Sequence, residues 1–468
     1  MDVLLIAFPK ADTIKKDKAS IPVGLLYLNE YLGRHGIQSE ILDLSVVGNH
    51  RVLRTMHASW ILGKHPKLVC LNCFSSYQFP MVMDTAKKIK TALPSVKVCV
   101  GGSHPTFFAG EILKHCQYID YVVIGEGETQ VHELARVAMG IPIKQLYKIQ
   151  SLCYRGQNGY ICTTPRTIYL QDLDIDYKAL WEPVDFCNYY ADHSTWNNPK
   201  GHDIRLAVPI LTSRACPFFC NFCSASNIMG RGLRPRSPEN VLDEIEYLYN
   251  ERKQSYFEFI DDNINVNRKH AMAIFSGIIK RDLDIQFSLA SGIHMASADE
   301  ELVRLMCDAG LAMIKLPIEH GNDDIRNRVI KKNLLKYQIF DIAAILKEYN
   351  VFTFGLFIMG FPEDTKNTLL DSYNLMKDLK LDIYETASLI PFPGTKIYEQ
   401  CKRDNLFISD IPQRDLWKGV IRFDASEHDK FYIKPYKMTV EELQECRRKI
   451  EAIRLFSKRA REGCNADH

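Results

Sequence analysis

The residues best suited to chemistry in this chain are three closely spaced cysteines, Cys216, Cys220 and Cys223. Spacings of four and three residues place their thiols on one short loop. Thiolates are soft ligands that suit zinc or an iron–sulfur cluster. A structural zinc site normally closes with four ligands, whereas three cysteines on a four-iron cluster leave one iron open. The triplet therefore favours a [4Fe-4S] cluster, with a zinc knuckle or three incidental core cysteines as the alternatives.

Polar residues and glycines follow the cysteines at the expected ends of β-strands. Asp262 lies in the segment Phe-Ile-Asp-Asp-Asn 259–263, and Glu319 lies in Ile-Glu-His-Gly 318–321. Carboxylates are unfavourable core residues, so these positions indicate a site; surface acids and a helix-capping acid are the alternatives. Ser288 and Ser291, which flank the end of the third barrel strand, are weaker candidates.

Alternating strand and helix patterns must position these residues. Strands are predicted near 206–212, 256–260, 285–290, 312–317, 352–359 and 383–389, with helices between them. Such βα units favour a partial (β/α)6 barrel over a second flat sheet. We therefore predict a barrel over 205–398, with the cysteine loop directly after its first strand.

The first 142 residues show the same alternation in a shorter form. Five strand patterns separated by helices predict a doubly wound, Rossmann-like α/β domain. Ligands of such domains bind at the carboxyl ends of the strands, where glycines allow close approach to the backbone. The candidates at these ends are Gly101, Gly102, Gly125 and Gly127, with Ser75 and Ser76 after the third strand. Pro22, Gly24, Glu126 and Glu128 are binding candidates through the family resemblance given below.

Two further regions complete the organisation. Residues 143–204 are predicted to form a linker that contains a hairpin, and 399–468 a small, mostly helical C-terminal region. Within the latter, Trp417, Phe423 and Phe431 are expected either to line a pocket or to form core. The basic side chains of the last helix, from Arg447 onward, are expected to face solvent, with a partner or membrane contact as the alternative.

Composition limits the classes of function. The chain has 468 residues, of which 46% are hydrophobic and 25% charged, with a net charge of +2. Near-neutral charge gives no electrostatic case for nucleic acid, and no apolar run reaches the ~20 residues of a membrane span. The 14 cysteines are too sparse for a disulfide scaffold, so a reducing cytoplasm is expected. Cys70, Cys73 and Cys99 are predicted to be buried free cysteines rather than ligands of a second cluster.

The pattern C-x3-C-x2-C, with Phe222 before the last cysteine, resembles the signature of the radical S-adenosylmethionine (SAM) superfamily. The N-terminal glycine motifs resemble the cobalamin-binding domain that precedes the radical domain in one large subclass, and together these likenesses cover about 400 residues in order. The resemblance implies that the three cysteines hold the cluster and that Asp262 contacts the SAM amino group. It further implies a ribose-binding role for Glu319 and an adenine site along the strand from Gly355 to Met359.

The resemblance also implies a function. One SAM molecule would methylate cobalamin, and a second would be cleaved at the cluster to a 5′-deoxyadenosyl radical that takes a hydrogen from the substrate. The result would be C-methylation of a small molecule, with electrons from a flavodoxin- or ferredoxin-type donor. Non-methylating chemistry, such as oxidative cyclisation or ring rearrangement, and a non-catalytic corrinoid- or cluster-binding protein are the alternatives. No Asp-x-His-x-x-Gly motif occurs in the first 150 residues, so cobalamin is expected base-off, without a histidine ligand.

Overall fold

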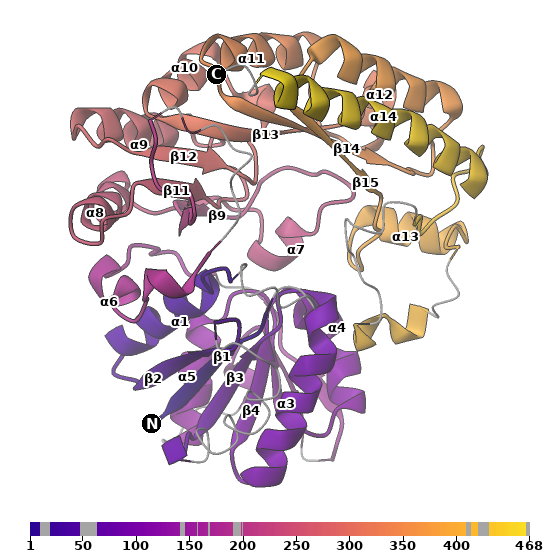
Figure 1. Ribbon diagram of the computed structural model, residues 1–468. Coiled ribbons are helices and arrows are strands. Elements are labelled where there is room, and N and C mark those ends of the chain that lie inside the picture. The colour runs from indigo at the N-terminus through magenta and orange to yellow at the C-terminus, as the bar shows by residue number, and fades with distance from the viewer. Residues whose placement is uncertain are drawn as a thin grey trace. The chain divides into compact units, whose positions relative to one another are not determined.

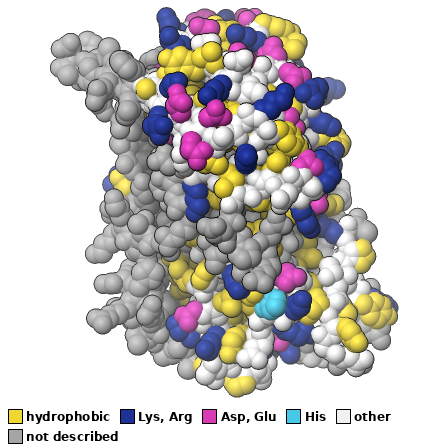
Figure 2. Space-filling view, turned by 90° about the vertical axis from the view of Figure 1, so that its right-hand side faces the viewer, with side chains coloured by type: hydrophobic (Ala, Val, Ile, Leu, Met, Phe, Trp, Pro, Cys, Tyr) yellow, Lys and Arg dark blue, Asp and Glu magenta, His cyan; other side chains and the backbone are white. Residues whose placement is uncertain are grey.

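A computed structural model describes residues 1–9, 19–46, 63–140, 146–156, 158–166, 169–190, 198, 200–408, 413–419 and 430–464. The chain divides into two compact units. The first comprises 1–192 and 411–423, and the second comprises 193–410 and 424–468. In the described part of the chain, no helix is long and apolar enough to cross a bilayer. On the face drawn in Figure 2, acidic and basic side chains are interspersed over the described surface.

The first unit is built on a sheet whose strand order is β2-β1-β3-β4-β5-β6-β7. Its first five strands are parallel and run over Val3–Ala7, Ser39–Asp43, Leu68–Asn72, Lys97–Gly101 and Tyr121–Val123. The helices are α1 (Val23–Arg34), α3 (Phe79–Ala92), α4 (Ser103–His115) and α5 (Glu128–Ala138). One core lies under α3 and α4 and the other under α1 and α5, so helices cover both faces of the sheet (Figure 1). The doubly wound domain is confirmed.

The hairpin expected within a linker extends this sheet instead. Strand β6 (Leu152–Arg155) pairs antiparallel with β5, and β7 (Ile161–Thr163) pairs with β6. An unpaired edge exposes a row of backbone donors and acceptors, and the hairpin satisfies those of β5. The first unit therefore extends past residue 142, and the linker segment also carries the short helix α6 (Tyr177–Trp181).

The second unit holds a parallel sheet in the order β15-β14-β13-β12-β11-β8, so consecutive strands are neighbours. Right-handed crossovers that all step in one direction put every helix on the same face, which is the winding of a barrel. The strands are β8 (Val208–Ile210), β11 (Tyr256–Phe259), β12 (Gln286–Leu289), β13 (Leu311–Glu319), β14 (Phe352–Met359) and β15 (Ile383–Ser388). The helices between them are α8 (Pro238–Asn250), α9 (Arg268–Lys280), α10 (Glu300–Asp308), α11 (Lys336–Glu348) and α12 (Lys366–Leu379).

The C-terminal region contains α13 (Lys396–Arg403), the short 3-10 helix η6 (Gln413–Lys418) and the last helix α14 (Val440–Cys464). Arg447 does not face solvent, unlike Arg448 and Lys449 in the part of α14 whose side chains are described: it is buried, and its guanidinium lies 5.0 Å from the ring centre of Phe431. The expectation of a solvated face is wrong for this residue, because α14 packs on α12 and β15. Phe431 is likewise core, whereas Phe423 lies outside the described residues.

Trp417 belongs to the core of the first unit, although it lies far away in the sequence. Its ring stacks on His115 at 4.9 Å and meets Phe79 edge-on at 6.3 Å.

We expect Trp417→Ala to lower the free energy of unfolding of the first unit by about 3–5 kcal/mol, the usual cost of removing a large buried aromatic. Urea denaturation of the whole chain measures the effect, with exposed Lys114→Ala as the control; equal midpoints for the two variants would contradict it.

Candidate functional site

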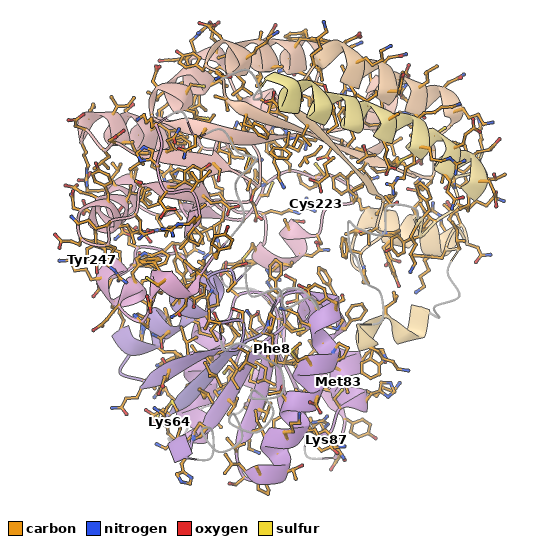
Figure 3. All side chains as sticks on the ribbon, in the orientation of Figure 1. Phe8, Lys64, Met83, Lys87, Cys223 and Tyr247 are labelled. Atoms are coloured by element: carbon orange, nitrogen blue, oxygen red, sulfur yellow. The ribbon has the colours of Figure 1, made fainter. Side chains whose placement is uncertain are left out.

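The cysteine loop leaves strand β9 (Ser213–Arg214) and leads into α7 (Ala225–Met229), with Cys223 just before the helix (Figure 3). All three thiols are free. Burial raises the pKa of each thiol, that of Cys223 to about 11, and the neighbouring thiols of the triplet raise those of Cys220 and Cys223 further. A bound metal centre would offset this cost, because thiolates are the liganding form.

The donor set fits a cluster better than a single ion. Among the described residues, no three or more His, Cys, Asp or Glu side chains are grouped to hold one metal ion. A [4Fe-4S] cluster is larger than an ion and spreads its ligands more widely, and it takes three thiolates with one iron left open. Three free cysteines on one loop are the number of thiolates that such a cluster takes, whereas a structural zinc site normally closes with four ligands.

The loop is anchored at its start by a buried carboxylate. Asp261 accepts hydrogen bonds from the Thr212 backbone N–H at 3.2 Å, the Thr212 hydroxyl at 2.8 Å and the Ser213 hydroxyl at 2.6 Å. Burial raises the pKa of Asp261 to about 6 despite these donors. Asp262, the sequence candidate, is exposed instead, and partial desolvation raises its pKa. The two adjacent acids thus divide into one structural carboxylate and one that is free to meet a ligand.

His294 supports the loop from a second side and was not singled out from the sequence. Its ring stacks on Phe218 with centres 3.5 Å apart. Its backbone N–H donates to Asn263 at 3.0 Å and Asn265 at 2.9 Å. Burial lowers the pKa of His294 to about 4, so the ring is neutral near pH 7. Nothing in the local sequence around His294 distinguishes it from an ordinary core histidine.

Glu319 lies at the end of β13 and is buried beside Lys332, with 2.8 Å between its carboxylate oxygen and the lysine Nζ. Its backbone has φ +67°, a left-handed conformation that costs a non-glycine residue about 1–3 kcal/mol. Backbone strain of this kind persists only where the surrounding structure enforces it, and it occurs often at active sites and ligand-binding sites. Lys332 is a second residue that the sequence analysis missed.

The remaining barrel candidates divide by orientation. Ser288 is buried and donates to the Phe257 carbonyl, at 3.4 Å, whereas Ser291 is exposed at the carboxyl end of β12. Phe222 packs edge-on against Phe361, at 6.2 Å, beside the core under α13. Phe222 therefore helps to fasten the cysteine loop to the barrel.

Gly355 and Met359 lie on the helix-covered face of β14. A Cβ on Gly355 would stand 2.8 Å from the Tyr384 ring, so the glycine makes room for a core side chain. Met359 packs with Leu369 of α12 and Leu443 of α14. Alternate residues of a strand face opposite sides, and Gly355 and Met359 share the side that packs against core side chains. The expectation that both line an adenine site must therefore be corrected. The other face of β14 carries Phe354, Leu356 and Ile358.

In the first unit, the predicted glycines meet at the carboxyl ends of neighbouring strands. Gly102 begins α4 with φ +112°, and a Cβ there would lie 2.5 Å from the Cys73 carbonyl oxygen. Thr106 ties this turn to the next one: its hydroxyl donates to Gly102 O at 2.8 Å and accepts from Gly125 N at 2.9 Å. Gly101 ends β4 and Gly127 precedes α5. The turns after β4 and β5 are therefore joined through the Thr106 hydroxyl.

The acidic side chains of this edge accept hydrogen bonds from backbone N–H groups. Glu126 accepts from the Leu170 backbone N–H at 3.3 Å, and Glu128 accepts from Gly127 N at 3.2 Å. Pro22 and Gly24 lie at the start of α1, where Gly24 is exposed and a Cβ on it would meet no atom within 4 Å. These positions leave backbone open for a ligand at the amino end of α1.

The turn after β3 carries the polar groups that a ligand at this edge would meet. The Ser75 hydroxyl is buried and has no hydrogen-bond partner among the described residues. Ser76 is engaged, since its hydroxyl lies 2.9 Å from Nδ1 of His104. An orphaned buried hydroxyl is costly unless something binds it. Together with the open glycine edge, it fits the hydrogen-bonding tail of a large cofactor such as cobalamin.

Both ring nitrogens of His104 form hydrogen bonds within the protein. Its Nε2 donates to the Trp417 carbonyl at 2.9 Å, so Nδ1 is the acceptor of the Ser76 hydroxyl. Burial lowers the pKa of His104 to about 4.

Cys70, Cys73 and Cys99 are buried and free as predicted, and Cys70 and Cys73 lie in opposite core layers.

Comparison with known families matches both halves of this description. A model of the B12 binding domain matches residues 12–135, and a model of the radical SAM superfamily matches residues 210–376. The two domains follow one another in the order that the sequence predicts, and the cysteine loop lies inside the second. The chain therefore belongs to the cobalamin-dependent radical SAM enzymes, a class that uses a [4Fe-4S] cluster, SAM and cobalamin.

Individual relatives differ in their reactions. The chain is 28% identical to an uncharacterised methyltransferase of Pyrococcus horikoshii over 87% of this chain and 85% of the relative. It is 26% identical to the anaerobic magnesium-protoporphyrin IX monomethyl ester cyclase of Rubrivivax gelatinosus, over 75% of this chain but 60% of that relative. Its fold is similar to the radical SAM methyltransferase TsrM of Kitasatospora setae, with TM-score 0.71, 17% identity and coverage of 96% and 88%.

Proposed function

We propose that the protein is a C-methyltransferase that replaces an unreactive C–H hydrogen of a small molecule with a methyl group from SAM. The observation that carries this proposal is the relative from Pyrococcus horikoshii, which is named a methyltransferase and is matched over most of both chains. The bound cluster would supply an electron for SAM cleavage, and cobalamin would carry the methyl group. Two SAM molecules and two electrons enter per product: one SAM becomes S-adenosylhomocysteine, and the other becomes methionine and 5′-deoxyadenosine.

In this proposal the chain's own residues bind and orient. Cys216, Cys220 and Cys223 hold the cluster, exposed Asp262 accepts from the SAM amino group, and Glu319 accepts from ribose hydroxyls. Ser75 and the glycine edge of the first unit hold the cobalamin tail. Electrons come from a flavodoxin- or ferredoxin-type donor, and the reaction takes place in a reducing cytoplasm.

Product analysis tests the proposal. The reconstituted protein is incubated anaerobically with SAM labelled in its methyl group, a low-potential reductant and candidate substrates. Methylation requires S-adenosylhomocysteine, 5′-deoxyadenosine and label in the product, in equal amounts. Label-free product alongside 5′-deoxyadenosine, without S-adenosylhomocysteine, would contradict it.

The second candidate is non-methylating radical chemistry such as oxidative cyclisation, favoured by the cyclase of Rubrivivax gelatinosus. It consumes SAM without transferring its methyl group, so the same labelled assay separates the two. A non-catalytic binding protein, the third candidate, would cleave no SAM even with reduced cluster and substrate present.

For cobalamin we propose the base-off form without a histidine ligand. His104 supports this, because both of its ring nitrogens are used within the protein. We expect the cobalt(II) form of the loaded protein to give an electron paramagnetic resonance (EPR) spectrum without nitrogen hyperfine splitting. His104→Ala is expected to leave the spectrum unchanged. Nitrogen splitting that disappears in His104→Ala would overturn this proposal.

A further inference from the structure

A buried lysine stands beside the cysteine loop. Lys332 is 7% exposed and forms an ion pair with Glu319, which is equally buried. Burying two charges carries a desolvation penalty that good geometry only offsets, so a buried pair is weak evidence for stability alone. Burial works against the charge of Lys332, but the Glu319 carboxylate beside it raises the pKa of the lysine. Lys332 is therefore the cationic partner of the ion pair.

The fold brings the two partners together through a fastened loop. Arg326, fully buried, donates to the Leu334 carbonyl at 2.8 Å and to the His320 carbonyl at 2.8 Å. It sits in a single π-helical turn, Ile325–Val329, a feature that occurs often at functional sites. These bonds join the residue after Glu319 to Leu334, so the segment that carries Lys332 folds back toward Glu319.

The same segment contacts the cysteine loop directly. The backbone N–H of Asn221, between the second and third cysteines, donates to the Ile330 carbonyl at 3.1 Å. His294 joins the two from the other side: its Nε2 donates to the Lys332 carbonyl at 3.3 Å, and its ring stacks on Phe218. Hydrogen bonds at Ile330 and at Lys332 itself thus tie the backbone of this segment to the cysteine loop and to His294, which stacks on that loop.

We propose that Lys332 is a positioning residue that holds the Glu319 carboxylate in place and makes the cluster easier to reduce. This inference rests on the proposed function. Reduction moves one electron from a low-potential donor onto the cluster and adds one negative charge, and no bond is made or broken. A cation fixed in a water-poor setting favours the added charge, because Coulomb interactions there are weakly screened. Glu319 has the opposite effect on the cluster and partly offsets the lysine.

The test is the midpoint potential of the reconstituted cluster, followed by EPR in a redox titration. Lys332→Met is expected to lower the equilibrium constant for reduction about tenfold, a downward shift of about 59 mV for one electron. Glu319→Gln is expected to move the potential upward, and the double variant Glu319→Gln/Lys332→Met to lie between the two. Lys331→Met is the matched control: it removes an adjacent but exposed lysine and is expected to leave the potential unchanged.

Opposite shifts from the two partners are a signature that loss of packing alone would not produce. Equal shifts from Lys331→Met and Lys332→Met, or a potential unmoved by Lys332→Met, would overturn the inference. If Lys332→Met assembles no cluster, Glu319→Gln and the neutral double variant carry the test, and a downward or absent shift in Glu319→Gln overturns it. A wild-type chain that binds no iron would instead overturn the proposed function.

Discussion

Replacing Cys220 with alanine is expected to abolish cluster assembly and SAM cleavage together. The side chain is one of three thiols on a loop that has no fourth cysteine, so its loss leaves two ligands. Changes outside the ligand set of a metal site already cost about 10–100-fold in affinity. Loss of a ligand should exceed that range, and iron content should fall from about four per chain to near zero. Iron and sulfide analysis after anaerobic reconstitution measures it.

The control for this prediction is Cys187→Ala. Cys187 is free and exposed, and it lies in the first unit, away from the triplet in the sequence. It is expected to keep the full iron content and the same rate of 5′-deoxyadenosine formation. A Cys220→Ala protein that still held about four irons and cleaved SAM would show that the triplet is not the ligand set.

Two glycines of the first unit are expected to respond oppositely to alanine. Gly102→Ala should lower the free energy of unfolding by about 1–3 kcal/mol from backbone strain alone, since φ is +112°. The added methyl would also meet the Cys73 carbonyl at 2.5 Å, so β3 and α4 must separate. We expect a lower melting temperature and loss of cobalamin binding.

Gly24→Ala isolates the cofactor contact from the fold. The position lies in the first turn of α1 with nothing within 4 Å of an added Cβ, so stability should hold or rise by about 0.5–1 kcal/mol. If cobalamin lies over this turn, the methyl group blocks it, and cobalamin retained after desalting should still fall. Full cobalamin retention in both variants would place the cofactor elsewhere.

Local signals in the sequence predicted the elements well. Each barrel strand was expected within a few residues of its observed bounds, because apolar runs bounded by turn residues mark buried parallel strands. The loop that carries the three cysteines likewise follows the first barrel strand, as expected, and its role as a cluster site stays a prediction. The face of β14 could not be predicted in this way. The residues from Phe354 to Met359 are apolar on both faces of the strand. The pattern of polar and apolar residues therefore does not indicate which face points into the barrel.

Residues whose roles depend on partners far away in the chain also could not be identified from the sequence. His294 gains its place by stacking on Phe218, and Lys332 by a loop that Arg326 closes; neither contact leaves a local pattern. Trp417 completes a core built by residues about 300 positions earlier, as its carbonyl bond to His104 shows. Such long-range packing is fixed by tertiary structure, which propensity and periodicity do not describe.

The most direct test of the account is metal analysis with an absorption spectrum, on protein purified anaerobically with cobalamin supplied. We predict about four irons and one cobalt per chain, with iron depending on the cysteine triplet and cobalt on the first unit. Four irons without cobalt, even after reconstitution, would contradict it, and the proposed methyl transfer would have to be withdrawn.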